Sequence, residues 1–129
     1  MAKTDIDSAF RIIPIHPCDF HLLGMQWQGK HYFGRCLPMG CSTSCSIFES
    51  FSTALEWIAK QVLGSQAIIH ILDDFFIVAS TGSACRRQMH KFLALCDDLG
   101  VPIAEGKTFV PLTTLSVCRN YTRLYYDAG

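Results

Sequence analysis

The sequence lacks the cysteine pattern of a disulfide framework or of a zinc site. Its seven cysteines are an odd number, and no two of them form a C-x-x-C pair. The segment His16-x-Cys18-x-x-His21 contains metal-ligand residue types, but no second ligand pair follows at a useful spacing. We therefore expect free thiols, mostly as small core residues, in a reducing intracellular compartment.

Charge and long apolar runs are also scarce. Charged residues make up 17% of the 129 residues, against about a quarter in an average soluble domain. The formal net charge is zero, so the basic excess of a dedicated nucleic-acid-binding domain is missing. The apolar runs are too short to span a membrane, and the polar start from Met1 to Asp5 does not indicate a signal peptide. Half of the residues are apolar, which predicts one domain that buries some of its surface against parts it lacks.

The residue pattern predicts an α+β fold, with an antiparallel sheet and two main helices packed on one face. Each helix is predicted to end at a glycine, the first at Gly64 and the second at Gly100. The expected elements follow in chain order: a strand ending near Asp5, a turn at Asp7-Ser8, an extended piece closed by Pro14 and Pro17, a hairpin of 22–27 and 30–36 turning at Gln28-Gly29, a helix over 44–63, a hairpin of 67–71 and 75–79, a helix over 83–99, and a strand over 107–110.

Asp73-Asp74 is the pair that carries most information about chemistry. Nearly pure hydrocarbon flanks it, from Ile68 to Leu72 before and from Phe75 to Val78 after. Two adjacent carboxylates in such surroundings repel each other and need a cation or a basic partner. Carboxylate oxygens are the hard ligands that magnesium prefers. From composition alone, an exposed turn explains the pair equally well, because turns favour aspartate.

A third carboxylate, Asp5, favours the metal site. It is expected at the end of a short strand far away in the sequence, where it can complete a two-metal site for phosphoryl transfer. Asp7 is the weaker candidate, because we expect it in the following turn.

Four segments in this order resemble the sequence motifs of reverse transcriptases. Lys3 to Ile15 resembles the first palm motif, and Leu37 to Gly40, continuing to Phe48, resembles the second. His70 to Phe75 resembles the aromatic-x-Asp-Asp hairpin, with Ile71 where the family usually has an aromatic residue. Leu99 to Thr108 resembles the lysine-bearing motif that follows. The amino-acid sequences of these motifs most resemble those of retrotransposon enzymes of the tyrosine-recombinase group.

The resemblance implies an RNA-directed DNA polymerase whose catalytic centre uses two Mg²⁺ ions, or Mn²⁺ in their place. Asp5, Asp73 and Asp74 match the metal-binding catalytic carboxylates, and the backbone carbonyl of Ile6 would also contact a metal. The implied partners are a primer-template of RNA or DNA and a deoxynucleoside triphosphate, with no membrane partner.

Four further residues match nucleotide contacts of the family. Phe10 matches the aromatic residue beneath the incoming sugar, where a flat ring excludes a 2′-hydroxyl; a plain core aromatic is the alternative. Gly40 matches the glycine that lets the backbone approach nucleotide and template, and Met39 occupies a variable position beside it. Lys107 matches a lysine near the nucleotide phosphates, where a proton donor to pyrophosphate is useful; a solvated surface lysine is equally compatible with the sequence.

The resemblance covers only part of such an enzyme. We expect residues 1–112 to be a partial palm without fingers, thumb or RNase H, and residues 113–129 to be an aberrant tail. One codon choice for the tail, shifted by one base, reads Val-Phe-Val-Gly-Ile-Thr-Leu-Asp-Ser, which suits the primer-grip strand. We therefore hypothesise a frameshift near residue 115 and a poorly ordered tail, which sequencing of the gene tests.

Two other functions remain open at this point. The chain can be an inactive mobile-element remnant with no catalytic task, which a missing cooperative melt would indicate. A nucleotide-cyclising palm is a third class, against which Phe10 and the Leu37 to Gly40 motif speak.

Overall fold

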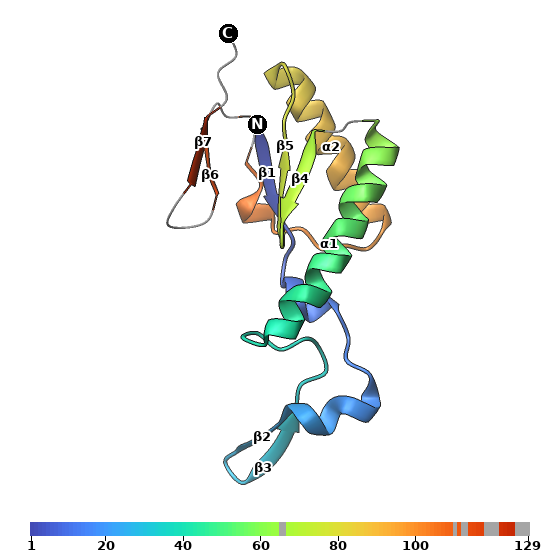
Figure 1. Ribbon diagram of the computed structural model, residues 1–129, viewed down its shortest axis with the longest axis vertical. Coiled ribbons are helices and arrows are strands. Elements are labelled where there is room, and N and C mark those ends of the chain that lie inside the picture. Colours follow the sequence, from blue (N-terminus) through green and yellow to red (C-terminus); the bar gives the residue numbers. More distant parts are fainter. Residues whose placement is uncertain (65–66, 110, 112–113, 118–121, 126–129) are drawn as a thin grey trace. The chain divides into compact units, whose positions relative to one another are not determined.

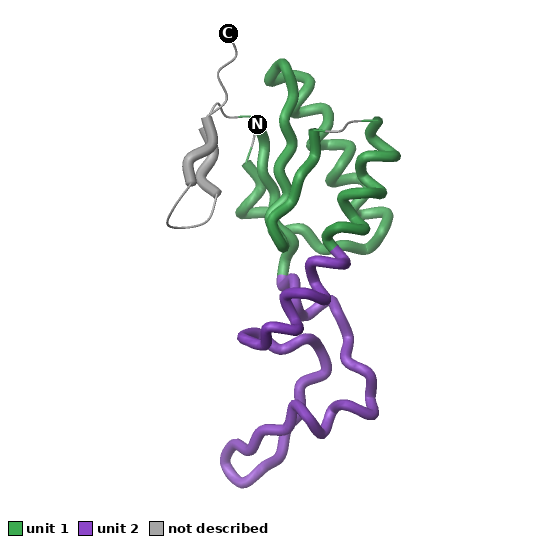
Figure 2. The backbone as a smooth tube through the Cα atoms, in the orientation of Figure 1, with its two compact units in different colours: residues 1–7, 52–129 green, residues 8–51 purple. Residues whose placement is uncertain are grey.

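The computed structural model describes residues 1–64, 67–109, 111, 114–117 and 122–125. The chain forms two compact units, one of residues 1–7 with 52–129 and the other of residues 8–51 (Figure 2). Helix α1 (Ser42–Leu63) begins in the second unit and ends in the first.

The first unit contains a three-stranded antiparallel sheet of β1 (Ala2–Asp5), β5 (Asp74–Ile77) and β4 (Ile68–Ile71), in the order β1-β5-β4 (Figure 1). Residues that lie directly opposite each other on neighbouring strands share a face of the sheet. The register therefore assigns one face to side chains that are 0% exposed: Ala2, Thr4, Ile68, Phe75 and Ile77.

Two helices cover this buried face. The ring of Phe92 in α2 (Gly82–Asp98) lies 5.1 Å from the ring of Phe75. From α1, Glu56 contacts His70, which lies opposite Phe75 on the same face. The predicted α+β class, an antiparallel sheet with two main helices on one face, is therefore confirmed (Figure 1).

The second unit contains a hairpin of β2 (Gly24–Trp27) and β3 (Lys30–Phe33). Its two turn residues, Gln28 and Gly29, have φ of 49° and 75°. Two consecutive positive φ values match the type I′ turn that joins two-residue hairpins, so the predicted turn is confirmed. The 3₁₀ helices η1 (Ala9–Ile12) and η2 (Pro17–Leu23) precede the hairpin.

Two expectations for the backbone were wrong. The segment after Asp7-Ser8 does not begin as an extended piece, because Ser8 adopts a φ of 52° and the Arg11 N–H donates to the Ser8 carbonyl at 2.7 Å, which starts η1. The strand expected over 107–110 does not form in its described part: Lys107 ends the 3₁₀ helix η3 (Glu105–Lys107), and the only sheet-type pairing of residues 107–109 is an isolated bridge between Lys3 and Phe109.

The cysteines of the described chain are free thiols, as predicted, but most are not core residues. Only Cys85 and Cys96, both on the inner face of α2, are buried, and burial raises the pKa of the Cys96 thiol to about 12. Cys18, Cys41 and Cys45 are exposed. Those three belong to the unit of residues 8–51, in which few side chains are buried.

The tail contains two further strands, β6 (Thr114–Val117) and β7 (Thr122–Tyr125), which pair antiparallel. The side chains of the tail lie outside the described residues, so the hypothesis of a frameshift remains a prediction. Among the helices that the structure describes, none is long and apolar enough to cross a membrane.

Candidate active site

The three predicted carboxylates meet at one end of the sheet in the first unit. Asp5 ends β1 and lies directly opposite Asp74, the first residue of β5. Asp73 lies in the two-residue turn between β4 and β5, and its carbonyl accepts a hydrogen bond from the Ile6 N–H at 3.0 Å. Asp7 lies in a turn, as expected. The strand pairing therefore brings together groups that are nearly 70 residues apart in the sequence.

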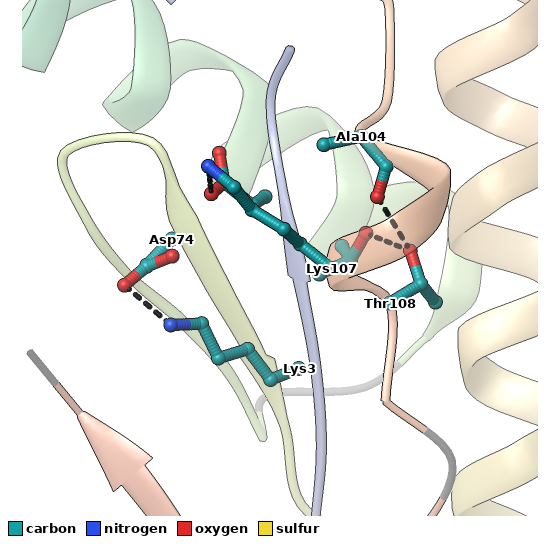
Figure 3. Close-up of polar contacts among 7 residues, drawn as sticks. Lys3, Asp74, Ala104, Lys107 and Thr108 are labelled. Carbon is teal, nitrogen blue, oxygen red and sulfur yellow. Dashed lines mark hydrogen bonds and ion pairs between the residues drawn. The ribbon is translucent and has the colours of Figure 1, made fainter. Parts of the chain in front are cut away.

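Two lysines neutralise part of this negative charge (Figure 3). The Nζ of Lys107 lies 2.6 Å from Oδ2 of Asp5, and the Nζ of Lys3 lies 2.7 Å from Oδ2 of Asp74. Lys107 was predicted near this site, whereas Lys3 was not. Lys3 precedes Asp5 by two residues and so shares its face of β1, which is the signal that the sequence offered.

The electrostatics of the site follow from these distances. Burial raises the pKa of the Asp73 carboxyl, and the negative charges of Asp5 and Asp74 raise it further. A hydrogen bond from the Asp73 backbone N–H and the positive charge of Lys107 lower it, but they do not outweigh the raising effects. The hydrogen bond to Asp5 raises the pKa of Lys107, and the charges of all three carboxylates act in the same direction. The site therefore attracts cations, as expected for carboxylates that are close together and poorly solvated.

The donor set suits a hard divalent cation. Asp5 is 5% exposed, and its Oδ1 is buried without a hydrogen-bond partner among the described residues. A buried carboxylate oxygen without a partner is costly, and a cation would remove that cost. In the part of the chain that is described, no three His, Cys, Asp or Glu side chains already converge on one point. Each lysine pairs with Oδ2 of its aspartate, so some of these side chains would have to turn before all three carboxylates could hold one cation.

Leu72 holds a strained conformation next to these carboxylates. Its φ of 53° lies in the left-handed region, which costs a branched L-residue about 1–2 kcal/mol. Strained residues that the surrounding structure holds in place concentrate at functional sites. Sequence inspection did not identify Leu72, because only the two-residue turn between β4 and β5 requires this φ.

Leu72→Gly is expected to raise the free energy of unfolding by up to about 1 kcal/mol, because glycine adopts this φ without strain. Urea denaturation measures the change. Leu99 is the matched control: its φ of −84° is ordinary, so Leu99→Gly should lower the stability by about 1 kcal/mol. Equal losses in both variants would show that Leu72 carries no backbone strain.

A second group of polar side chains, also missed in the sequence, lies on the helix-covered face. The Nδ1–H of His70 donates to one carboxylate oxygen of Glu56, and the Nζ of Lys60 lies 2.5 Å from the other Glu56 oxygen. Burial alone raises the pKa of Glu56, but the hydrogen bonds and positive charges of Lys60 and His70 outweigh it and hold that pKa below its ordinary value. This contact ties β4 to α1 three residues before Asp73, so it supports the hairpin that carries the carboxylates.

The other predicted site residues lie in the unit of residues 8–51. The Phe10 ring packs 5.3 Å from the ring of Phe48, which is a core contact and leaves its role toward a sugar a prediction. Met39 is 73% exposed. Gly40 has a φ of 85°, and nothing lies within 4 Å of the point where its Cβ would stand. Glycine is therefore needed at position 40 for its backbone conformation rather than for lack of space.

An antiparallel sheet with helices on one face and clustered carboxylates at its strand ends defines the class of protein as a polymerase-type α+β domain. The prototype foamy virus protease-reverse transcriptase, in its CSH mutant form, is similar with a TM-score of 0.73 and 21% identity over 88% of this chain and 14% of that one. A foamy viral protease-reverse transcriptase solved in complex with dsDNA gives a TM-score of 0.77 and 18% identity over 90% of this chain and 23% of that one. A foamy viral protease-reverse transcriptase in complex with an RNA/DNA hybrid gives a TM-score of 0.76 and 18% identity, over 90% of this chain and 15% of that one.

The chain belongs to the family described as reverse transcriptase (RNA-dependent DNA polymerase), which its residues 1–118 match. A comparison with curated protein sequences gave no match. The chain spans between about a seventh and a quarter of the length of the structures above, with 14% and 23% as the extremes.

Proposed function

We propose that this chain is the palm core of a reverse transcriptase from a retrotransposon, and that its site serves RNA-directed transfer of deoxynucleotides to a primer. The observation that carries the proposal is the meeting of Asp5, Asp73 and Asp74 at the strand ends, with one buried Asp5 oxygen lacking a partner. Two Mg²⁺ ions held there would supply the positive charge that phosphoryl transfer requires. Similarity to enzymes solved with dsDNA and with an RNA/DNA hybrid supports a primer-template as the partner.

The chain's own residues have distinct tasks in this proposal. Asp5, Asp73 and Asp74 hold the cations, together with the Ile6 carbonyl. Lys107 is 64% exposed at its side chain and hydrogen-bonds Asp5, so it can turn toward a nucleotide once a cation replaces it there. A lysine side chain is protonated at neutral pH, and release from Asp5 would remove the hydrogen bond that raises the pKa of Lys107, which favours transfer of its proton to the departing pyrophosphate.

The remaining contacts would come from residues 8–51. Phe10 is proposed to lie beneath the sugar of the incoming nucleotide, and Met39 and Gly40 are proposed to border the base pair that forms. The isolated chain is expected to have little or no activity, because positioning supplies most of phosphoryl-transfer catalysis and the similar enzymes are several times longer.

Single-nucleotide incorporation with the protein in excess over a labelled primer-template tests this proposal. We expect slow, Mg²⁺- or Mn²⁺-dependent extension that Asp74→Asn reduces at least about 1000-fold, since a cation ligand is removed. Asp98→Asn is the control, because this exposed carboxylate lies at the end of α2. Extension by Asp74→Asn at the wild-type rate would refute the proposed function.

A further inference from the structure

The two faces of the β2–β3 hairpin carry different side chains, and all residues of both strands are exposed. The register pairs Met25 with Tyr32 and Trp27 with Lys30, so these four side chains share one face. Phe33 belongs to the other face, where its ring stacks on Phe20 of η2 at 4.9 Å and Phe33 remains 53% exposed. The 3₁₀ helix η2 therefore contacts the Phe33 side, and the four-residue face lies on the opposite side of the hairpin. We call it the Trp27 face; the hairpin that carries it lies at one end of the unit of residues 8–51 (Figures 1 and 2).

The Trp27 face exposes flat rings beside a cation. Trp27 is 65% exposed, Met25 61% and Tyr32 46%. Large aromatic side chains in water carry a cost that a partner with flat apolar surfaces would remove. Lys30 lies directly opposite Trp27 in the strand register, so both side chains leave the same face of the hairpin at neighbouring positions.

A positively charged cavity adjoins this face through Met25. The cavity has a volume of about 570 Å³, and its lining includes Met25, Arg11 and Arg35 but no carboxylate. The chain contains no Asp or Glu between Asp19 and Glu49. Among the described residues, no ion pair joins Arg11, Lys30 or Arg35 to a carboxylate.

We propose that the Trp27 face and the adjoining cavity bind single-stranded nucleic acid. Bases stack on Trp27 and Tyr32, while Lys30, Arg11 and Arg35 contact the phosphates. Exposed aromatic rings beside a basic groove are the physical requirement for binding a single strand without sequence preference. The inference rests on the proposed function for its choice of partner and extends it by naming a surface that contains none of the three carboxylates. Met39, which the proposed function places beside the base pair, also lines the cavity.

The charge pattern favours a nucleic acid over a protein partner. The buried centre of a protein interface is depleted in lysine, whereas here Lys30 lies opposite the most exposed ring of the face. A polyanion can bind Arg11, Lys30 and Arg35, for which the described residues provide no carboxylate partner, and its bases can stack on the rings at the same time. A second copy of the chain would place these like charges against each other.

Tryptophan fluorescence tests the proposal without altering the face itself. The chain has two tryptophans, and Trp57→Phe leaves Trp27 as the only one. Titration with an oligothymidylate of about 15 nucleotides, near the upper end of the ~4–16 nucleotides that one such site covers, should quench this fluorescence. In Trp27→Phe, the remaining Trp57 signal should not change.

Anisotropy of the labelled oligonucleotide supplies the affinities. Trp27→Ala should weaken binding about tenfold, and Lys30→Gln should reduce the slope of log affinity against log salt by about 0.7. Trp57→Ala is the matched control, since Trp57 is 64% exposed, close to the 65% of Trp27, but lies on α1. Wild-type affinity in Trp27→Ala would overturn the proposal, as would an absence of binding together with self-association that Trp27→Ala abolishes in sedimentation.

The same assay separates this inference from the proposed function. Asp98→Asn should bind the oligonucleotide as tightly as the wild type, because Asp98 is an exposed residue at the end of α2 and is not part of the Trp27 face. Failure of the catalytic test with intact, Trp27-dependent binding would refute the polymerase proposal alone. Normal cation binding and extension with Trp27-independent strand binding would refute this inference alone.

Discussion

Asp73→Asn is expected to stabilise the chain in metal-free buffer and to remove its affinity for divalent cations. Burial and the charges of Asp5 and Asp74 raise the pKa of Asp73, so ionised Asp73 opposes folding at neutral pH. Asparagine removes that charge, so the free energy of unfolding should rise, in line with the trade-off between activity and stability at functional sites. Urea denaturation at pH 7 measures it.

The pH dependence gives the sign of the effect independently. A carboxyl whose folded pKa lies above its unfolded value contributes stability that is fully present below the unfolded pKa. That stability is lost as the pH rises through the folded pKa. The wild type should therefore lose stability from the ordinary aspartate range upward, and Asp73→Asn should lose less over the same window.

Asp73→Asn should weaken cation binding, although it raises the free energy of unfolding. Mn²⁺ affinity, measured from the free-ion signal in electron paramagnetic resonance, should fall at least about 100-fold in Asp73→Asn, because removal of even an outer partner of a metal ligand costs about 10–100-fold. Asp98→Asn should change neither stability nor affinity appreciably. A destabilised Asp73→Asn variant that binds Mn²⁺ normally would show that Asp73 is a structural turn residue.

Phe10→Ala is expected to reduce discrimination between dATP and ATP by about 100-fold, the scale on which a pocket rejects one extra hydroxyl group by shape. The physical reason is the loss of the ring that the incoming sugar would meet. Binding of each nucleotide in the presence of Mg²⁺, measured by isothermal titration, gives the ratio. Binding of dATP in preference to ATP would also argue against an inactive mobile-element remnant, which is not expected to bind either nucleotide.

Phe51 supplies the control for packing. The Phe51 ring lies 5.5 Å from Phe48, close to the 5.3 Å between Phe10 and Phe48, so both truncations open space beside the same buried ring. Phe51→Ala should lose similar stability and keep the dATP preference. Equal changes of the ratio in the two variants would assign Phe10 to the core alone.

The sequence was sufficient to predict the carboxylates because their positions depend on local patterns. Asp73 follows a four-residue apolar strand and precedes another, so its place at a hairpin tip follows from alternating strand and turn residues. Asp5 ends a strand for the same reason. The family motifs then supplied the long-range pairing of β1 with β5, which local patterns do not contain.

What the sequence did not reveal depends on three-dimensional pairing. The ion pair of Lys3 with Asp74 needs the β1–β5 register, and the contact of His70 with Glu56 needs the packing of β4 on α1. The φ of Leu72 is imposed by the two-residue turn between the strands, against the preference of leucine itself. The 3₁₀ turn at Phe10 likewise follows from the left-handed conformation of Ser8, which the presence of a serine in the sequence does not predict.

The most direct test of the carboxylate site is the anomalous scattering of Mn²⁺ in crystals of the chain grown with manganese. We predict density between the side chains of Asp5, Asp73 and Asp74, with Lys3 and Lys107 no longer paired to Asp74 and Asp5. Crystals in which both lysine pairs persist and no manganese lies among the three carboxylates would contradict the account.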